Sequence, residues 1–511
     1  MRATRSKEDD EMQTIAKTTQ GDIQGREKDG VLLFAGIPYA APPTGRRRFR
    51  APEPHEAWTG VREARRFGPA APQPREEGLT ANRNVEWNED CLTLNVCTPG
   101  VDDRRRPVLV WIHGGGFRTG QGGIPWYNGT SFAQRGDIVT VSLNYRLGAL
   151  GFAHLEDIGG ANYAGSGCNG IRDQIAALQW VRDNIAAFGG DPQQVTIAGE
   201  SAGGMSVGIL LGCPAAAGLF RGAIPQSGAA HNTLGSAEGS ELARRFAAAL
   251  GAGSIDELMS APVEGILAAQ VELERQSGRG DFRAWNATGL AGMPFQPVVD
   301  GHVLPQPPVD AVRAGLSSRV RVLVGTNRDE MTLFGLGGGD DDRLRRIVAR
   351  TFADADAALA VYRSEWPAAS PDELLIALMT DRVFRIPAIR LAEAMSENGG
   401  TAYQYLFTWE SRAFGGRLKA THALEIPFVF NNLARAGVDV FLGPGPTPQA
   451  LADAMHAAWI AFIRSGDPTC DAVGEWPAYR LDRRVVMELG ERIGMRSDPY
   501  GATRALWQGV V

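Results

Sequence analysis

The chain has 511 residues, of which 44% are hydrophobic and 22% are charged, an ordinary balance for a globular protein with a large core. The formal net charge of −6 argues against a nucleic-acid-binding protein, and there is no run of about 18 apolar residues that could span a membrane. The first residues lack the apolar stretch of a secretion signal and the five cysteines show no metal-binding spacing, so we expect a cytoplasmic protein.

After a polar tail at 1–18, which we expect to be disordered, the sequence predicts alternating strands and helices in one domain over 19–511. Apolar runs predict buried strands at 106–116, 136–146, 195–198, 218–228, 319–326 and 401–410. Apolar residues at every third or fourth position predict a helix at 173–192. A helix is also expected after residue 201, and a last amphipathic helix at about 447–464. This alternation predicts an α/β protein with a central, mostly parallel sheet and helices on both faces. Two insertions, at about 229–318 and 335–400, are expected to form a cap that shapes a substrate pocket.

The sequence GESAG at 199–203 places Ser201 between the end of a predicted strand and the start of a predicted helix. In that context, G-x-S-x-G is typical of a nucleophile elbow, a sharp turn that exposes the serine hydroxyl. The amides at the start of the following helix favour negative charge at the same place. A tight turn that contains a serine by chance is the alternative, and the pattern alone does not decide between them.

The sequence WIHGGGF at 111–117 follows another predicted strand. Backbone N–H groups of Gly115 and Gly116, together with that of Ala202, would bind the oxyanion that forms during acyl transfer. A phosphate-binding loop does not fit, because no Gly-Lys-Ser/Thr follows and the spacing is not GxGxxG. Two motifs that belong to one reaction favour catalysis over a structural turn.

A nucleophilic serine needs a general base, which in this strand-turn-helix arrangement follows the serine in the chain. His422 lies in a predicted loop after strand 401–410 and before the last predicted helix, where it can reach the sheet end. The other histidines after Ser201 lie in inserted segments or inside that helix: His231, His302 and His456. We therefore expect His422 to be the base.

The acid that orients the base is expected just after strand 319–326, where the sequence offers Asp329 and Glu330. The local pattern does not choose between these two carboxylates. Because the HExxH pattern of zinc hydrolases is absent, we expect no metal at this site. No other cofactor is expected.

The chain resembles the type-B carboxylesterases, the α/β-hydrolases that include bacterial p-nitrobenzyl esterases, acetylcholinesterase and the neuroligins. The resemblance runs from about residue 19 to the C-terminus. The stretches that carry it are FAGIPYAAPPTGRRRF (34–49), NEDCLTLNV (88–96), NYRLG (144–148), GIRDQIAALQWVRDNIAAFGGDPQQVTIAGESAGG (170–204), PQSG (225–228), GTNRDE (325–330), THALEIPFVF (421–430) and AWIAFIRSGDP (458–468).

This resemblance implies the α/β-hydrolase fold and a catalytic triad of Ser201, Glu330 and His422, so it selects Glu330 over Asp329. It also implies two residues that support the triad without belonging to it, Ser227 and Glu200. Of these, Ser227 would hydrogen-bond near the histidine and the acid. The structural ion pairs that it implies are Arg48–Glu89 and Arg146–Asp173.

Two departures from the family pattern carry information. Secreted relatives pair the cysteine of the EDC stretch with one in a GPxCPQ stretch, but here Ala71 stands in that place, so we expect Cys91 to be free. The choline-binding tryptophan of cholinesterases would lie about ten residues before that cysteine, where this chain has Ala81. A cholinesterase is therefore not expected.

The expected activity is hydrolysis of carboxylic esters of small to medium alcohols or phenols through an acyl-enzyme on Ser201. A carbamate or amide hydrolase with the same triad is the alternative that these residues leave open. A non-catalytic, neuroligin-like binding module is a remote alternative, because the triad is complete. The expected partner is a small-molecule ester, with no nucleic acid and no membrane, and the protein is expected to be a monomer or a homodimer.

Overall fold

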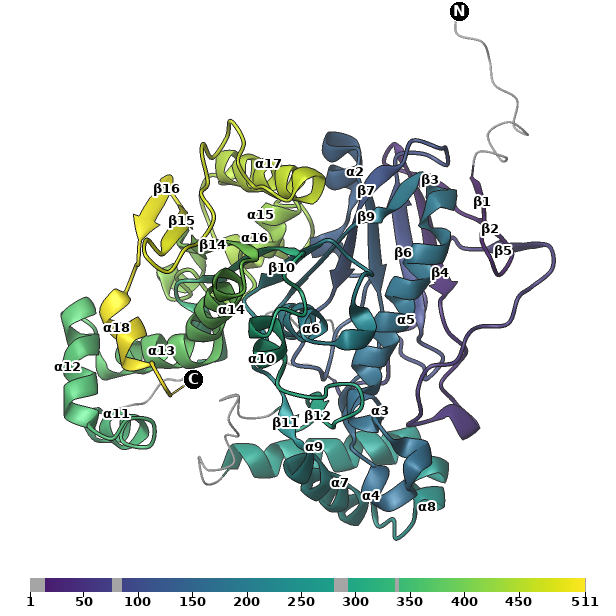
Figure 1. The fold of residues 1–511 in the computed structure, drawn as a ribbon, viewed down its shortest axis with the longest axis horizontal. Coiled ribbons are helices and arrows are strands. Elements are labelled where there is room, and N and C mark those ends of the chain that lie inside the picture. Colours follow the sequence, from purple (N-terminus) through teal and green to yellow (C-terminus); the bar gives the residue numbers. More distant parts are fainter. Residues whose placement is uncertain (1–13, 76–84, 280–292, 336–339, 511) are drawn as a thin grey trace, which may run out of the picture.

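A mixed sheet of 11 strands runs through the molecule (Figure 1). The structure is a computed structural model, which describes residues 14–75, 85–279, 293–335 and 340–510. The sheet is parallel in its centre and antiparallel toward both edges. In spatial order its strands are β16 (Ile493–Ser497), β15 (Val485–Leu489), β14 (Thr401–Phe407), β13 (Arg321–Asn327), β10 (Gly222–Gln226), β9 (Gly190–Glu200), β7 (Arg106–Ile112), β8 (Val139–Leu143), β6 (Thr93–Thr98), β4 (Val31–Pro38) and β3 (Arg26–Lys28).

Helices cover both faces of this sheet, because its central strands are apolar on both sides. In β7, Val108, Val110 and Ile112 belong to one buried cluster, whereas Leu109 and Trp111 belong to another. Since successive side chains of a strand point to opposite faces, the two clusters mark the two faces. The first face carries α5 (Asn169–Asn184), α6 (Ala202–Leu211) and α14 (Ile386–Glu397), and the second carries α2 (Thr130–Gly136), α15 (Ile426–Val429) and α17 (Gln449–Ser465). The predicted layered α/β architecture is confirmed.

The two predicted insertions are largely helical and extend from the sheet at two places (Figure 1). Residues 229–318 contain α7 (Ser236–Leu250), α8 (Ile255–Ser260), α9 (Val263–Arg279), α10 (Pro308–Arg313) and the two-stranded sheet of β11 (Leu234–Gly235) and β12 (Val298–Val299). Residues 335–400 contain α11 (Asp341–Val348), α12 (Ala355–Glu365), α13 (Pro371–Thr380) and α14. Because α14 packs on β13 and β14, the second insertion also covers the sheet. That the insertions shape a substrate pocket stays a prediction.

The predicted elements are present with shifted ends, and other elements were not predicted. The expected helix 173–192 ends earlier, as α5 followed by a short 3-10 turn, and Gly189 then takes a left-handed conformation with φ 73°. Strands at both sheet edges were missed, as was α18 (Gly501–Leu506), so α17 is not the last helix. Further short helices in the described residues are α3 (Gly148–Phe152), α4 (Glu156–Gly159) and α16 (Val438–Leu442).

The boundary of the N-terminal tail differs from the expected one. Ile15–Lys17 form β1, which pairs with β2 (Asp22–Gln24), and β2 in turn pairs with β5 (Val61–Glu63). The expected disorder up to residue 18 is therefore wrong for this strand, because its backbone finds partners in a small separate sheet. Residues 1–13 and Ala81 lie outside the described residues.

The ion pair between Arg146 and Asp173 joins the chain after β8 to α5. Both side chains are buried, and the guanidinium donates to the carboxylate through Nε at 2.8 Å and Nη2 at 2.7 Å. The backbone N–H of Arg146 also donates to that carboxylate at 3.0 Å. The other implied pair, Arg48–Glu89, forms two such bonds at 2.7 Å.

Replacing Arg146 with methionine is expected to lower the free energy of unfolding by about 3–5 kcal/mol, because the Asp173 carboxylate would stay buried without its partner. Chemical denaturation followed by circular dichroism measures this change. Arg182→Met is the matched control: Arg182 pairs with Asp183 at 2.7 Å, but both side chains are about half exposed. The control should cost at most about 1 kcal/mol. An equal loss in both variants would contradict the assignment of Arg146 as a structural pair.

The structure bears on two further sequence expectations. All five cysteines lie in the described residues and all are free, so Cys91 has no disulfide partner. Among the helices of the described ranges, none is both long enough and apolar enough to traverse a bilayer.

Candidate active site

Ser201 lies on a strained turn between β9 and α6. Its backbone has φ 57° and ψ −126°, a conformation that costs a non-glycine residue energy and that clusters at functional sites. The turn requires small neighbours, because a Cβ atom on Gly203 would lie 2.1 Å from the carbonyl oxygen of Ile112. The serine therefore stands where β9, β7 and the first turn of α6 meet. This is the predicted strand-turn-helix context.

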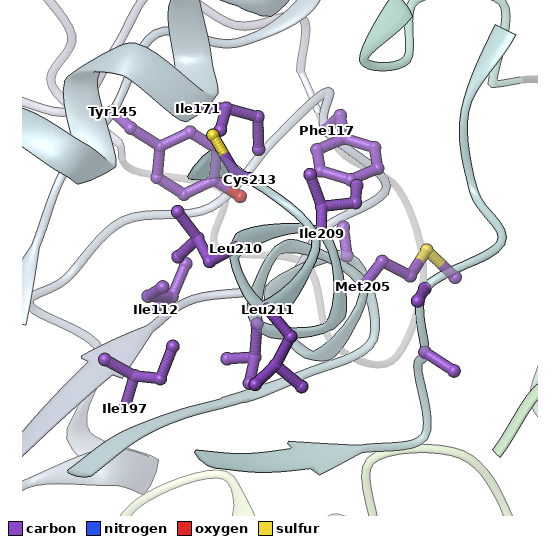
Figure 2. Packing of buried hydrophobic residues seen from close by; sticks show 14 of the residues in the cluster. Ile112, Phe117, Tyr145, Ile171, Ile197, Met205, Ile209, Leu210, Leu211 and Cys213 are labelled. Carbon is purple, nitrogen blue, oxygen red and sulfur yellow. The ribbon is translucent and has the colours of Figure 1, made fainter. Parts of the chain in front are cut away.

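Helix α6 is held rigidly behind this turn. All ten of its residues are buried, as expected for a helix that is apolar all round. Figure 2 shows Met205, Ile209, Leu210 and Leu211 of α6 packed among side chains from neighbouring elements. The labelled neighbours in that view are Ile112, Phe117, Tyr145, Ile171, Ile197 and Cys213. Because this packing fixes the first turn of α6, it also fixes the amides that follow Ser201.

The glycine-rich loop after β7 lies directly against the serine turn. A Cβ atom on Gly114 would lie 2.6 Å from the carbonyl oxygen of Glu200 and 3.0 Å from Cβ of Ser201. Gly115 and Gly116 have φ 104° and 64°, so the backbone turns sharply here. Within the described ranges, the backbone N–H groups of Gly115, Gly116 and Ala202 have no protein acceptor. Free donors of this kind beside a serine are suited to bind a developing oxyanion.

His422 and Glu330 form a short, buried hydrogen bond. Nδ1 of His422 lies 2.6 Å from Oε2 of Glu330, and the two side chains are only 5% and 0% exposed. The other carboxylate oxygen, Oε1, accepts the backbone N–H of Asn327 at 2.7 Å. The backbone N–H of His422 donates to the carbonyl oxygen of Glu330 at 3.3 Å, which ties the two loops together. The carboxylate is thereby fixed to accept a hydrogen bond from the Nδ1–H group, which leaves Nε2 free to accept a proton.

Nε2 of His422 faces the residue before the serine. It lies 3.1 Å from Oε1 of Glu200, and both side chains are 5% exposed. Apart from this ion-pair contact, neither Nε2 nor Oε1 has a hydrogen-bond partner among the described residues. The Ser201 hydroxyl therefore does not donate to the imidazole in this structure. Catalytic hydrogen bonds commonly tighten only when the substrate is bound. The structure thus brings Glu200, Glu330 and His422 into one buried cluster, with Ser201, which is partly exposed, next to Glu200 in the chain.

The pKa of His422 reflects two opposing effects. Burial lowers the pKa of an imidazole because it penalises the charged form, but the carboxylates of Glu200 and Glu330 outweigh burial and raise the pKa to about 9. Burial likewise raises the pKa of Glu200 well above its usual range. The imidazole and the Glu200 carboxyl group therefore compete for protons within one buried site.

Glu425 is a third carboxyl group in this cluster, and the sequence analysis missed it. It accepts hydrogen bonds from Nε2 of Gln226 at 3.1 Å and from Nδ2 of Asn327 at 2.7 Å. Burial, together with the charge of Glu330, raises the pKa of Glu425 to about 7. The available signal was a single acidic residue inside the apolar stretch LEIPFVF, because a buried acid in such a run needs partners.

The structure separates the predicted site residues from their competitors. The Asp329 carboxylate pairs with Arg328 at 2.8 Å and accepts the backbone N–H of Ala420 at 3.1 Å, whereas Nδ1 of His422 lies against Glu330. Ser227 is fully buried with φ 45°, but its Oγ has no hydrogen-bond partner in the described part of the chain, so its expected hydrogen bond is not formed.

Two of the histidines that were not expected to be the base have other partners: His302 lies beside Glu156, and His456 lies beside the Val429 carbonyl. Over the described ranges, no group of three or more His, Cys, Asp or Glu residues could hold a metal ion.

Two phenylalanine rings flank the imidazole. The ring centroid of Phe384 lies 4.7 Å from that of His422, and the ring centroid of Phe334 lies 5.4 Å away. Phe384 is buried, whereas Phe334 is 48% exposed. The imidazole is therefore covered by apolar surface on the sides that do not face the carboxylates.

A family model described as the carboxylesterase family matches residues 12–507 of this chain. The chain belongs to the carboxylesterase family. Para-nitrobenzyl esterase of Bacillus subtilis strain 168 is 38% identical over 502 residues, which cover 96% of this chain and 97% of that protein. Phenmedipham hydrolase of Pseudarthrobacter oxydans is 38% identical over 493 residues, which cover 93% of this chain and 95% of that protein.

Solved structures agree with the family assignment. Carboxylesterase EST55 of Geobacillus stearothermophilus, at pH 6.2, has a TM-score of 0.86 at 40% identity, covering 97% of this chain and 100% of that one. A solved PNB esterase has a TM-score of 0.86 at 36% identity, covering 97% and 99% of the two chains. The expected α/β-hydrolase fold and the expected class of enzyme, a carboxylic ester hydrolase, are confirmed for this carboxylesterase.

Replacing Glu200 with glutamine is expected to move the acid limb of the kcat/KM–pH profile to lower pH. The neutral amide removes one of the charges that raise the pKa of His422, so the imidazole stays neutral, and able to accept a proton, at lower pH. The profile of the variant carboxylesterase against that of the wild type measures the shift. An unchanged limb, or one displaced to higher pH, would show that Glu200 does not set the pKa of the base.

Proposed function

We propose that the protein is a serine carboxylesterase in which Ser201 is the nucleophile, His422 the general base and Glu330 the acid that orients the base. The single observation that carries this proposal is the 2.6 Å contact between Nδ1 of His422 and the buried Glu330 carboxylate, beside the strained serine turn. A serine hydroxyl is a weak nucleophile at neutral pH, so a base with a fixed tautomer is the feature that this chemistry needs.

The proposed reaction has two steps. In the first, Ser201 Oγ attacks the ester carbonyl while Nε2 of His422 takes the hydroxyl proton, and the alcohol leaves with that proton. In the second, water attacks the acyl-enzyme while Nε2 of His422 takes its proton; the acyl–Oγ bond then breaks, the proton passes to Ser201 Oγ, and the acid product leaves. In both steps the N–H groups of Gly115, Gly116 and Ala202 bind the oxyanion, a role supported by their position beside the serine turn.

The proposed substrates are carboxylic esters of small to medium alcohols or phenols. A carbamate is the second candidate, because one relative at 38% identity is named phenmedipham hydrolase. The buried triad-like geometry serves either substrate, since both present a carbonyl carbon to the serine. We also propose a cytoplasmic location, supported by the free cysteines, and a monomer or homodimer as the state of assembly.

Steady-state kinetics on matched aryl substrates tests the proposed function. The panel consists of p-nitrophenyl acetate, butyrate and octanoate, an N-aryl carbamate and p-nitroacetanilide, with kcat/KM as the measure. We expect the highest values for the esters. A higher kcat/KM for the carbamate would replace the proposed substrate class, and no hydrolysis of any substrate would reject the proposed function.

A further inference from the structure

A π-helical turn, Asp381–Arg385, and the residue before it contact the loop that carries His422 and the loop that carries Glu330. It lies between α13 and α14, and π-helical turns inside helices are frequent at functional sites. From this turn Phe384 packs against the imidazole of His422, with ring centroids 4.7 Å apart. Just before the turn, the hydroxyl of Thr380 accepts the backbone N–H of Met331, which follows Glu330, at 3.3 Å. A shift of this turn would therefore displace the histidine and its acid together.

A buried ion pair within the turn fixes its shape. Arg385 donates to Asp381 through Nε at 2.5 Å and through Nη2 at 2.8 Å, and the two residues are only 6% and 1% exposed. Asp381 also accepts the hydroxyl of Tyr362 at 2.7 Å. A buried ion pair of this kind is costly unless its remaining hydrogen-bonding groups are satisfied. The groups that hydrogen-bond to the pair from outside the turn, its outer partners, therefore determine whether the turn keeps this geometry.

Those outer partners come from the far C-terminal part of the chain. Trp507 is fully buried, and its Nε1 donates to the Tyr362 hydroxyl at 2.8 Å. Nη2 of Arg385 donates to Oγ1 of Thr503 at 2.7 Å, and Nη1 of Arg385 donates to the carbonyl oxygen of Pro499 at 3.3 Å. Residues 499–507 thus hold both members of the Asp381–Arg385 ion pair, Asp381 through Tyr362 and Arg385 directly.

We propose that residues 499–507 position the imidazole of His422 through the π-helical turn, so that Thr503 and Trp507 are positioning residues for ester hydrolysis. This inference rests on the proposed function, in which His422 is the base. The serine and Nε2 are not yet bonded to each other, so the reactive alignment depends on small movements of the imidazole. Misplacement of a reacting group by about 1 Å can cost about 100-fold in rate, even when its cause lies far from the chemistry.

A purely structural role for the C-terminal segment makes a different prediction. In that case the loss of its hydrogen bonds lowers the stability of the protein but leaves the active folded enzyme unchanged. In the positioning role, the loss lowers kcat while KM stays nearly constant, because substrate contacts are kept and only the alignment of the base is lost.

Two variants of Thr503 and two tryptophan variants separate these roles. Thr503→Val keeps the shape but removes the hydroxyl that accepts from Arg385, whereas Thr503→Ser keeps the hydroxyl. Trp507→Phe removes the indole N–H, and Trp476→Phe is the matched control, because Trp476 is 1% exposed and its Nε1 has no partner among the described residues. The measurements are kcat and KM for p-nitrophenyl acetate, the thermal midpoint, and the low-field proton resonance of the Nδ1–H that His422 shares with Glu330.

We expect Thr503→Val and Trp507→Phe to lower kcat about tenfold with KM within about twofold, and to shift the low-field resonance. Thr503→Ser and Trp476→Phe should keep both near the wild-type values. A lower thermal midpoint with unchanged kcat and resonance would overturn the inference. If the wild type hydrolyses no ester, the proposed function fails, but an unshifted resonance in Thr503→Val and Trp507→Phe would still overturn the positioning role independently.

Discussion

Replacing Ser201 with alanine is expected to lower kcat for p-nitrophenyl acetate by about 10⁶-fold, because the variant lacks the hydroxyl proposed to attack the ester carbonyl. Alanine keeps the Cβ atom of serine, so the strained backbone of the turn is unchanged. Neither the packing of α6 nor the pairing of β9 depends on the hydroxyl. The variant should therefore fold normally, which circular dichroism and the thermal midpoint check.

Ser227→Ala is the matched control for this change. Like Ser201, Ser227 is a serine with a positive φ at the end of a central strand, but Ser227 is fully buried, and its Oγ has no hydrogen-bond partner in the part of the chain that the structure describes. We expect its removal to change kcat by less than about tenfold, because the Ser227 hydroxyl forms no hydrogen bond in the described part of the chain. Near-full activity in Ser201→Ala would reject Ser201 as the nucleophile, and an equal loss in both variants would point to a general disturbance of the sheet edge.

The local sequence predicts most of the serine turn, because each constraint there acts on a neighbouring residue. The turn needs glycine at 199 and 203, since the backbones of β7, β9 and α6 approach within contact distance. Those glycines, the apolar strand before them and the small residues after them all lie within ten positions. The glycine loop after β7 was also predictable, because its glycines directly follow the apolar strand in the sequence.

The hydrogen-bond partners of His422 could not be predicted from the local sequence, because they depend on which side chains are buried together in the fold. Asp329 and Glu330 are adjacent and both acidic, but one turns toward Arg328 and the other toward His422. The difference arises from the 3-10 turn that begins at Glu330, which directs successive side chains to different sides. Only the family resemblance selected Glu330 before the structure. Glu425 was missed for the same reason, since its partners Gln226 and Asn327 are far away in the sequence.

The sheet edges and the π-helical turn mark a second limit of sequence analysis. The edge strand β16 is mostly exposed, so its residues carry no apolar pattern that would indicate a strand. Between α13 and α14 the backbone hydrogen bonds change from the α-helical to the π-helical pattern at Asp381–Arg385. No glycine in this turn indicates the change in the sequence. The change is stabilised by partners in residues 499–507, which no local pattern connects to Asp381.

Replacing Glu330 with glutamine is expected to lower kcat by about 10⁴-fold with little change in the fold. Oε1 of Glu330 accepts the backbone N–H of Asn327, so the amide oxygen of glutamine would occupy that position and its NH₂ group would face Nδ1 of His422. An amide NH₂ can only donate, which forces the imidazole proton from Nδ1 onto Nε2. Nε2 then cannot accept the serine proton, so the base has the wrong tautomer.

Glu425→Gln is the matched control, because Glu425 is also a buried glutamate near His422 but faces Gln226 and Asn327 rather than Nδ1. Its pKa is raised to about 7, so the carboxyl group is partly protonated at neutral pH and a neutral amide resembles it. We expect kcat of this variant to stay within about tenfold of the wild type, because the tautomer of His422 is preserved. Single-turnover acylation by p-nitrophenyl acetate measures both variants. Equal rates in Glu330→Gln and Glu425→Gln would show that buried charge in general, and not the contact at Nδ1, makes His422 a base.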